Sequence, residues 1–283
     1  MTSLSERVHL ERHRVGPFRA FWLVLRGVVE HHAQILSVFW NDFNTPHRKN
    51  VLGVVWAYAM PLLPITAYIF VRVVIRDPST AANQVHPAVF VILGVIPWLL
   101  IRACVITPFE SINRYKTLVM NAKFPLIAAI VSGFGMVTME TLIRLVACVA
   151  TLLVLGGVAP GGVVPAVAVL AVMTVFSLSI GIALVPVMIA IPDVRHVLDI
   201  FFRYAIFFSG VIWAVPELGG SDAMYRYNPL AVFIGSIRDL TLYNTVPYPA
   251  ILVGLTIATP LMVLVATRTL YATELQIKES LSR

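Results

Sequence analysis

The chain has 283 residues, of which 59% are hydrophobic and only 12% are charged, and its mean hydropathy is +0.86. Soluble domains carry roughly 25% charged residues. The composition therefore excludes an ordinary soluble domain and predicts an all-α membrane protein. The net charge of +7 comes mostly from basic residues that flank the apolar segments, so it does not indicate nucleic-acid binding.

The N-terminal segment Phe18–Asn41 predicts an amphipathic helix. Its apolar and aromatic residues recur at helical spacing, and Arg19, Arg26 and Glu30 belong to a second, polar stripe. Such a helix suits the cytoplasmic membrane interface; a helix packed in the cytoplasm is the alternative. Charged residues interrupt the first positions of the chain, so we expect no cleavable signal peptide there. Residues 1–50 are the predicted cytoplasmic N-terminus.

Six segments are apolar enough to be membrane spans, because a spanning helix needs about 20 mostly apolar residues. They form a predicted transmembrane domain over residues 51–271, followed by a cytoplasmic tail over 272–283. The predicted spans are Val51–Ile75, Ala88–Ser111, Leu126–Gly156, Val164–Ile191, Leu198–Val215 and Tyr248–Tyr271.

The basic residues predict the orientation of these spans. An even number of spans puts both termini on one side. That side holds fifteen lysines and arginines, whereas the other side holds only Arg76, Arg226 and Arg238. Because basic residues gather on the cytoplasmic side, both termini are predicted to be cytoplasmic.

The external region before the last span contains a segment of a different kind. Asn228–Pro229 is a helix-start signal, and the apolar run Leu230–Ile237 is too short to cross a membrane. The segment Asn228–Tyr243 is therefore predicted to re-enter the membrane from outside as a gate, with Asn228, Pro229 and Phe233 as gate residues. A folded external loop is the alternative.

The sequence offers little chemistry of its own. None of the four lysines follows a glycine, so a GxxxxGK[ST] phosphate loop is excluded, and any ATP must be bound by another chain. His9 and His13 lack the glutamate of an HExxH motif, and Cys104 and Cys148 sit inside predicted spans. We predict no catalytic residues, no metal site and no cofactor in this chain.

Charged residues inside predicted spans are candidates for function. Arg102, Glu140 and Arg144 have this position, and the spacing of Glu140 and Arg144 suits a pair on one helix. We predict one buried charge cluster from these three residues. A structural ion cluster is one interpretation, and a proton or substrate relay is the other.

Aromatic residues cluster on the first and fifth predicted spans. Ring faces can stack on sugar rings, which predicts Tyr58, Tyr68, Phe202 and Phe207 as residues of a substrate channel. An aromatic belt facing lipid is the alternative.

Several stretches, in order, resemble one family. They are HRKNVLGVVWAYAMPLL, LGVIPWLL, INRYKTLVMNAKFPL, IPDVRHVLD and YNPLAVFIGSIRD. Together they resemble the ABC-2 type permeases that export cell-surface polysaccharides such as O-antigen, teichoic acid and capsule. The resemblance implies a homodimer of six-span permeases with an amphipathic interface helix before span one and short re-entrant helices before span six.

The resemblance also implies partners and a location. Two copies of a separate ATPase subunit would bind ATP and Mg²⁺, and the substrate would be a glycan on a polyprenyl diphosphate lipid, handled in the bacterial cytoplasmic membrane. The loop Ile112–Pro125 would couple to the ATPase, which makes it the site of the predicted coupling residues Asn113, Arg114, Tyr115, Lys116, Leu118, Val119 and Met120. The alternatives are that its basic residues only anchor topology, or that the turn Ile191–Asp199 couples instead.

Two other functions stay open from the sequence. A membrane-embedded enzyme acting on polyprenyl-phosphate lipids would need clustered acidic or histidine residues at one membrane face, and we find none. An ion-coupled secondary transporter would favour inverted repeats with broken helices, and the two halves show no such match. Seventeen arginines against four lysines suggest a GC-rich genome, which favours a cell-wall galactan over an O-antigen.

Overall fold

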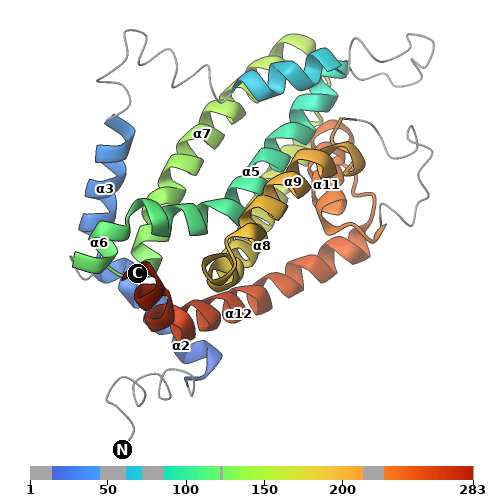
Figure 1. The fold of residues 1–283 in the computed structure, drawn as a ribbon. Helices are drawn as coiled ribbons and strands as arrows, with labels where there is room; N and C mark the ends of the chain where they lie inside the picture. Colours follow the sequence, from blue (N-terminus) through green and yellow to red (C-terminus); the bar gives the residue numbers. More distant parts are fainter. Residues whose placement is uncertain (1–14, 45–61, 72–85, 122–123, 213–225, 283) are drawn as a thin grey trace, which may run out of the picture.

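The computed structural model describes residues 15–44, 62–71, 86–121, 124–212 and 226–282. All regular secondary structure in these ranges is helical (Figure 1). In addition to a short helix over Leu62–Val71, the elements are α2 (Pro17–Glu30), α3 (His32–Asn44), α5 (Pro87–Arg114), α6 (Lys116–Asn121), α7 (Leu126–Leu155), α8 (Pro160–Ala190), α9 (Asp193–Phe208), α11 (Pro229–Tyr243) and α12 (Pro249–Ser282).

Four of the described helices, α5, α7, α8 and α12, are long and apolar enough to cross a membrane, which indicates a membrane protein. They coincide with the predicted second, third, fourth and sixth spans. The predicted boundaries hold to within a few residues, except at the end of the chain. There α12 continues as one helix to Ser282, past the predicted border at Tyr271.

The first and fifth predicted spans have a different outcome. Of Val51–Ile75, only the short helix Leu62–Val71 lies within the described residues. The fifth, Leu198–Val215, corresponds to α9, which begins earlier, at Asp193, and ends at Phe208 after 16 residues. The early start is favoured by Asp193, because a carboxylate in the first turn interacts well with the positive end of the helix dipole. The number of six spans therefore stays a prediction.

Helix α5 is the centre of the fold. Most of its apolar stretch is buried, whereas only a minority of the corresponding stretches of α7, α8 and α12 is buried. It packs against α7, α8, α9 and α11, and Trp98 and Ile101 lie fully inside. A helix that is apolar on all sides is expected at such a position.

Small residues let the helices approach α5 closely. A Cβ atom added at Gly181 of α8 would lie 2.4 Å from the carbonyl oxygen of Cys104 and 2.8 Å from Val105. On α7, a Cβ atom at Gly133 would lie 1.9 Å from the Ser111 hydroxyl. Close packing at small residues of this kind is typical of membrane helices.

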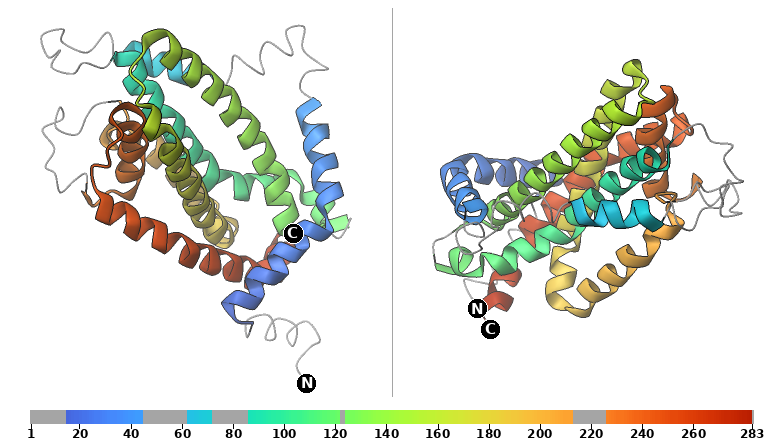
Figure 2. Two further views of the ribbon diagram at one scale, coloured as in Figure 1. Left: turned by 180° about the vertical axis from the view of Figure 1, so that it is seen from behind. Right: turned by 90° about the horizontal axis from the view of Figure 1, so that it is seen from above.

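The molecule has two distinct ends. At one end, which we call the α6 end, α2, α3 and α6 lie near the C-terminal part of α12 (Figures 1 and 2). A second hydrophobic cluster joins these elements, with Ile35, Val119 and Leu281 among its members. At the opposite end, the α11 end, α11 packs against the first turns of α5 and α8, and Ala159 N–H donates to the Thr241 carbonyl at 2.9 Å.

We expect Gly181→Ala to destabilise the protein, because its new methyl group would meet the α5 backbone, which cannot move aside as a side chain can. Overpacking of a core typically costs about 1–3 kcal/mol. The apparent melting temperature in detergent should fall by several degrees. Gly254→Ala on α12 is the matched control, because nothing lies within 4 Å of its added Cβ atom. Equal melting temperatures for the two variants would contradict the close α5–α8 packing.

Candidate functional site

The α6 end contains a polar junction between the surface helix α3 and the end of α5. The Tyr115 hydroxyl donates to the Asp42 carboxylate at 2.6 Å, and Arg114 donates to the same oxygen at 3.3 Å. Tyr115 is the residue between α5 and α6, so this junction fixes the start of α6 relative to α3. Burial, and then the hydrogen bond to Asp42, raise the pKa of Tyr115, so its hydroxyl remains a donor at physiological pH.

The predicted coupling residues divide into two groups at this junction. Arg114 and Tyr115 point back to Asp42, and Val119 is only 2% exposed within the second cluster. These contacts hold α6 in place, while the Arg114 side chain stays 57% exposed. The coupling role of the three residues remains a prediction. Lys116, Leu118 and Met120 are exposed, the last two at 38% each, and Asn113 is exposed while donating to the Phe109 carbonyl at 3.1 Å.

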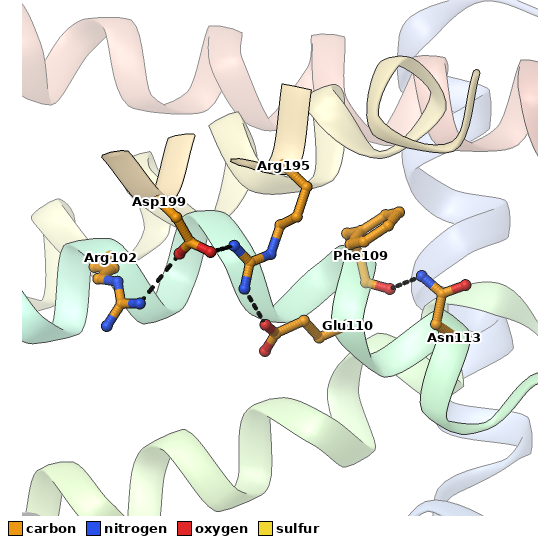
Figure 3. Close-up of polar contacts among 6 residues, drawn as sticks. All are labelled: Arg102, Phe109, Glu110, Asn113, Arg195 and Asp199. Carbon is orange, nitrogen blue, oxygen red and sulfur yellow. Dashed lines mark hydrogen bonds and ion pairs between the residues drawn. The ribbon is translucent and has the colours of Figure 1, made fainter. Parts of the chain in front are cut away.

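Ion pairs fasten α9 to α5 (Figure 3). Arg195 of α9 donates to Glu110 of α5 at 2.5 Å and also to Asp199 on its own helix. Arg102 of α5 donates to Asp199 at 3.1 Å. Burial alone lowers the pKa of Arg195, but the two carboxylates raise it, so the guanidinium stays charged.

The predicted charge cluster is arranged differently from the expectation. Arg144 donates to Glu140 one turn earlier on α7 at 2.8 Å, whereas Arg102 binds Asp199 of α9. Arg102 and Glu140 have side chains that are about half exposed within the single chain, so only Arg144 is buried. All three nevertheless line one cavity of about 250 Å³ between α5 and α7, together with Glu110, Arg114 and Arg195.

The outer face of α9 carries the exposed aromatic residues. Phe201, Tyr204 and Phe208 share this face and are half or more exposed, and Phe207 lies beside them. Phe202 instead is 4% exposed and packs on Trp98, with ring centroids 5.7 Å apart, so it belongs to the core of the single chain. Its role as a channel residue stays a prediction. Tyr68 is half-buried against the core, and Tyr58 lies outside the described residues.

A shallow groove of about 700 Å³ runs between this aromatic face and the start of α11. Phe201, Tyr204 and Phe208 line one side. Tyr227, Asn228 and Pro229 line the other, so two predicted gate residues lie at the groove. The groove combines aromatic ring faces with the polar Asn228 at one edge, a mixture typical of ligand sites.

The α11 segment has the predicted helix start. The Asn228 side chain accepts from the Leu230 and Ala231 N–H groups at 3.1 and 3.3 Å, and Pro229 follows at the first helical position. Phe233 is fully buried against Phe176 of α8, with ring centroids 5.6 Å apart. It therefore belongs to the core of the single chain, and its role in a gate stays a prediction.

Arg238 of α11 is a residue whose role the sequence did not reveal. It is buried and donates to the carbonyls of Gly210 and Val211 at 2.9 Å each, immediately after α9. Its guanidinium lies 3.6 Å from the centre of the Phe90 ring, and it passes over Gly94, where an added Cβ atom would lie 2.3 Å away. Arg238 thus joins α11, the end of α9 and the start of α5.

Within the described part of the chain, no group of three histidine, cysteine or carboxylate side chains is arranged to hold a metal ion. No protein-family model matches the sequence, and a search of curated proteins finds no match. The interpretation of these sites therefore rests on their own geometry.

We expect Arg195→Met to loosen α9 from α5, because it leaves the Glu110 and Asp199 carboxylates without this partner. The cost should be about 1–3 kcal/mol, between that of a surface pair and that of a buried pair. The apparent melting temperature in detergent measures it, and adding Glu110→Gln should restore part of the loss. Arg26→Met, which breaks the exposed pair with Glu30, is the control and should change nothing measurable. A double variant less stable than Arg195→Met would show that the pair does not hold α9.

Proposed function

We propose that this chain is the membrane subunit of an ATP-driven exporter of lipid-linked polysaccharide, a homodimer that works with two copies of a separate ATPase subunit. The observation that carries the proposal is the junction at the α6 end. A short helix is fixed by side-chain bonds to a surface helix, while its own apolar residues stay exposed. Helix α6 holds Leu118 and Met120 outward and buries Val119, which suits docking to another protein.

The energy source must lie outside this chain because the sequence has no phosphate loop. In the proposed complex the ATPase pushes on α6 from the cytoplasm. Tyr115 and Arg114 pass that force to Asp42 of α3, and α5 passes it directly into the centre of the fold.

The interface helices support the same orientation. In α2, Phe18, Trp22 and Val29 are exposed and large, and in α3 the same holds for Leu36 and Trp40. Aromatic residues at such positions favour the boundary between lipid and water. We place α2 and α3 on the cytoplasmic membrane surface, with both termini and α6 on that side of six spans.

The proposed substrate path follows the aromatic face of α9 toward α11. Phe201, Tyr204 and Phe208 offer ring faces to successive sugars, and the groove leads to Asn228 and Pro229 at the start of the proposed re-entrant gate. Arg238 keeps α11 and the end of α9 together, so the gate and the path move as one unit. The substrate class is a polyprenyl diphosphate glycan.

The coupling part of the proposal predicts the effect of Leu118→Ser combined with Met120→Ser. The docking contact is apolar, so losing the exposed apolar pair should lower export at least tenfold. The ATPase subunit should still hydrolyse ATP, because its own active site is unchanged. Export in cells and ATP hydrolysis by the reconstituted complex are the two measurements. Leu153→Ser with Val154→Ser, two exposed residues at the far end of α7, is the control pair. Intact export in the α6 variant would move coupling to the turn Ile191–Asp199.

The path predicts opposite effects for neighbouring aromatic residues on α9. Replacing Phe201, Tyr204 and Phe208 with alanine should reduce export and leave the melting temperature near that of the wild type, because all three side chains are exposed. Phe202→Ala should instead lower the free energy of unfolding by up to about 5 kcal/mol, because it removes a buried ring. Normal export by the triple variant would show that the sugar chain takes another route.

A further inference from the structure

Three contacts set the level of each α9 residue along α5. Arg195 meets Glu110, Asp199 meets Arg102, and Phe202 meets Trp98, so the two helices run antiparallel. Figure 3 shows the first two of these contacts. Trp98 is near the middle of the 28-residue helix α5. Arg203 of α9 follows Phe202 directly. It therefore lies at about the level of the middle of α5, which is long enough to cross the membrane.

Arg203 is exposed at this level, one turn after Asp199 and on the flank of α9 next to the stripe that contacts α5. It makes no hydrogen bond or ion pair with any described residue. The nearest acidic residue on its own helix is Asp199, whose carboxylate is already bound by Arg102 and Arg195. Its neighbours on the same stripe of the helix are Ile200 and Phe207, and His196 lies two turns toward the α6 end.

A guanidinium facing hydrocarbon at mid-membrane is costly, so such residues face water, a charged partner or a substrate pathway. This side of α9 is therefore not a lipid-facing surface. Arg203 does not line the aromatic groove itself, but it directly precedes Tyr204, which does, and Phe207 lies one turn further along its own stripe. A surface that places one cation beside ring faces fits a ligand with an anionic group next to a sugar.

We propose that Arg203 binds the phosphate-bearing part of the transported molecule as it passes along α9. Arginine presents several N–H donors in a planar array that matches phosphate oxygens, and such charge-assisted bonds are about twice as strong as neutral ones. The proposal rests on the proposed function for the identity of the ligand. It adds that one residue of the path recognises charge, whereas its aromatic neighbours recognise sugar rings.

The test measures binding by the full-length chain in detergent, through the shift of its melting temperature on titration. The probes are a polyprenyl diphosphate, inorganic diphosphate and the uncharged polyprenol. We expect the wild type to bind the diphosphate lipid and not the polyprenol. Arg203→Gln should weaken that binding by about tenfold or more, the size of one lost charged contact, whereas Arg203→Lys should retain part of it.

Arg268→Gln is the matched control, because Arg268 is also an exposed arginine on a membrane helix but lies on α12, away from the groove. It should bind the lipid as the wild type does. Binding of inorganic diphosphate that is equally lost in Arg203→Gln would show that the site recognises the anion whether or not lipid is attached. Binding of the lipid alone would show that the attached chain is also required.

Three results would overturn the proposal. Equal binding by the wild type and Arg203→Gln would leave the proposed exporter in place and remove Arg203 from its path. A shift of Arg203→Gln from dimer to monomer, without a change in lipid affinity, would show that Arg203 pairs with a second copy. Failure of the wild type to bind the diphosphate lipid would remove the substrate class itself, and with it the phosphate role of Arg203.

Discussion

The backbone contact between α5 and α8 determines how the rest of this protein is arranged. Gly181 brings the two helices together until the α5 carbonyl at Cys104 occupies the space of a missing side chain. Lipid offers little hydrophobic driving force between helices, so close van der Waals packing of this kind must supply much of their association. With α8 fixed in this way, α7 and α12 pack around the same centre, and α9 and α11 attach to it from the side.

The two attachments to α5 differ in chemistry. Helix α11 is buried along most of its length and is joined to the end of α9 by the Arg238 guanidinium on two carbonyl oxygens. Helix α9 instead meets α5 through ion pairs and one aromatic contact. An apolar interface resists sliding because side chains interlock, whereas an arginine that binds two carboxylates can keep one while it releases the other.

Local signals in the sequence predicted the features that depend on one segment alone. Long apolar runs located α5, α7, α8 and α12, and Asn228–Pro229 located the start of α11. The partners of the charged residues could not be predicted in this way. Whether Arg102 meets Glu140 or Asp199 depends on how α5 sits against α7 and α9, and no single segment contains that information.

The inward position of Phe202 could have been predicted from the sequence. Arg195, Asp199, Phe202 and Ile206 recur at helical spacing, so a face that carries the paired charges must also carry Phe202 toward the core. The opposite face then consists of Val197, Phe201, Tyr204 and Phe208. Arg238 was harder to interpret, because an arginine outside the long apolar runs counts as a topology signal. Its role became visible only when the carbonyls of Gly210 and Val211 were found beside it.

The distribution of arginines connects the mechanics of this protein with its proposed cargo. Arg102, Arg144 and Arg195 each bind a carboxylate of the protein, and Arg238 binds backbone carbonyls and lies over an aromatic ring. Their charges are used to hold helices together. Arg203 instead is exposed on the flank of α9, at mid-membrane level and next in sequence to Tyr204 of the aromatic groove. A charge at that depth needs an anion or water, and an anion that arrives with each transported molecule would satisfy it only while substrate occupies the path.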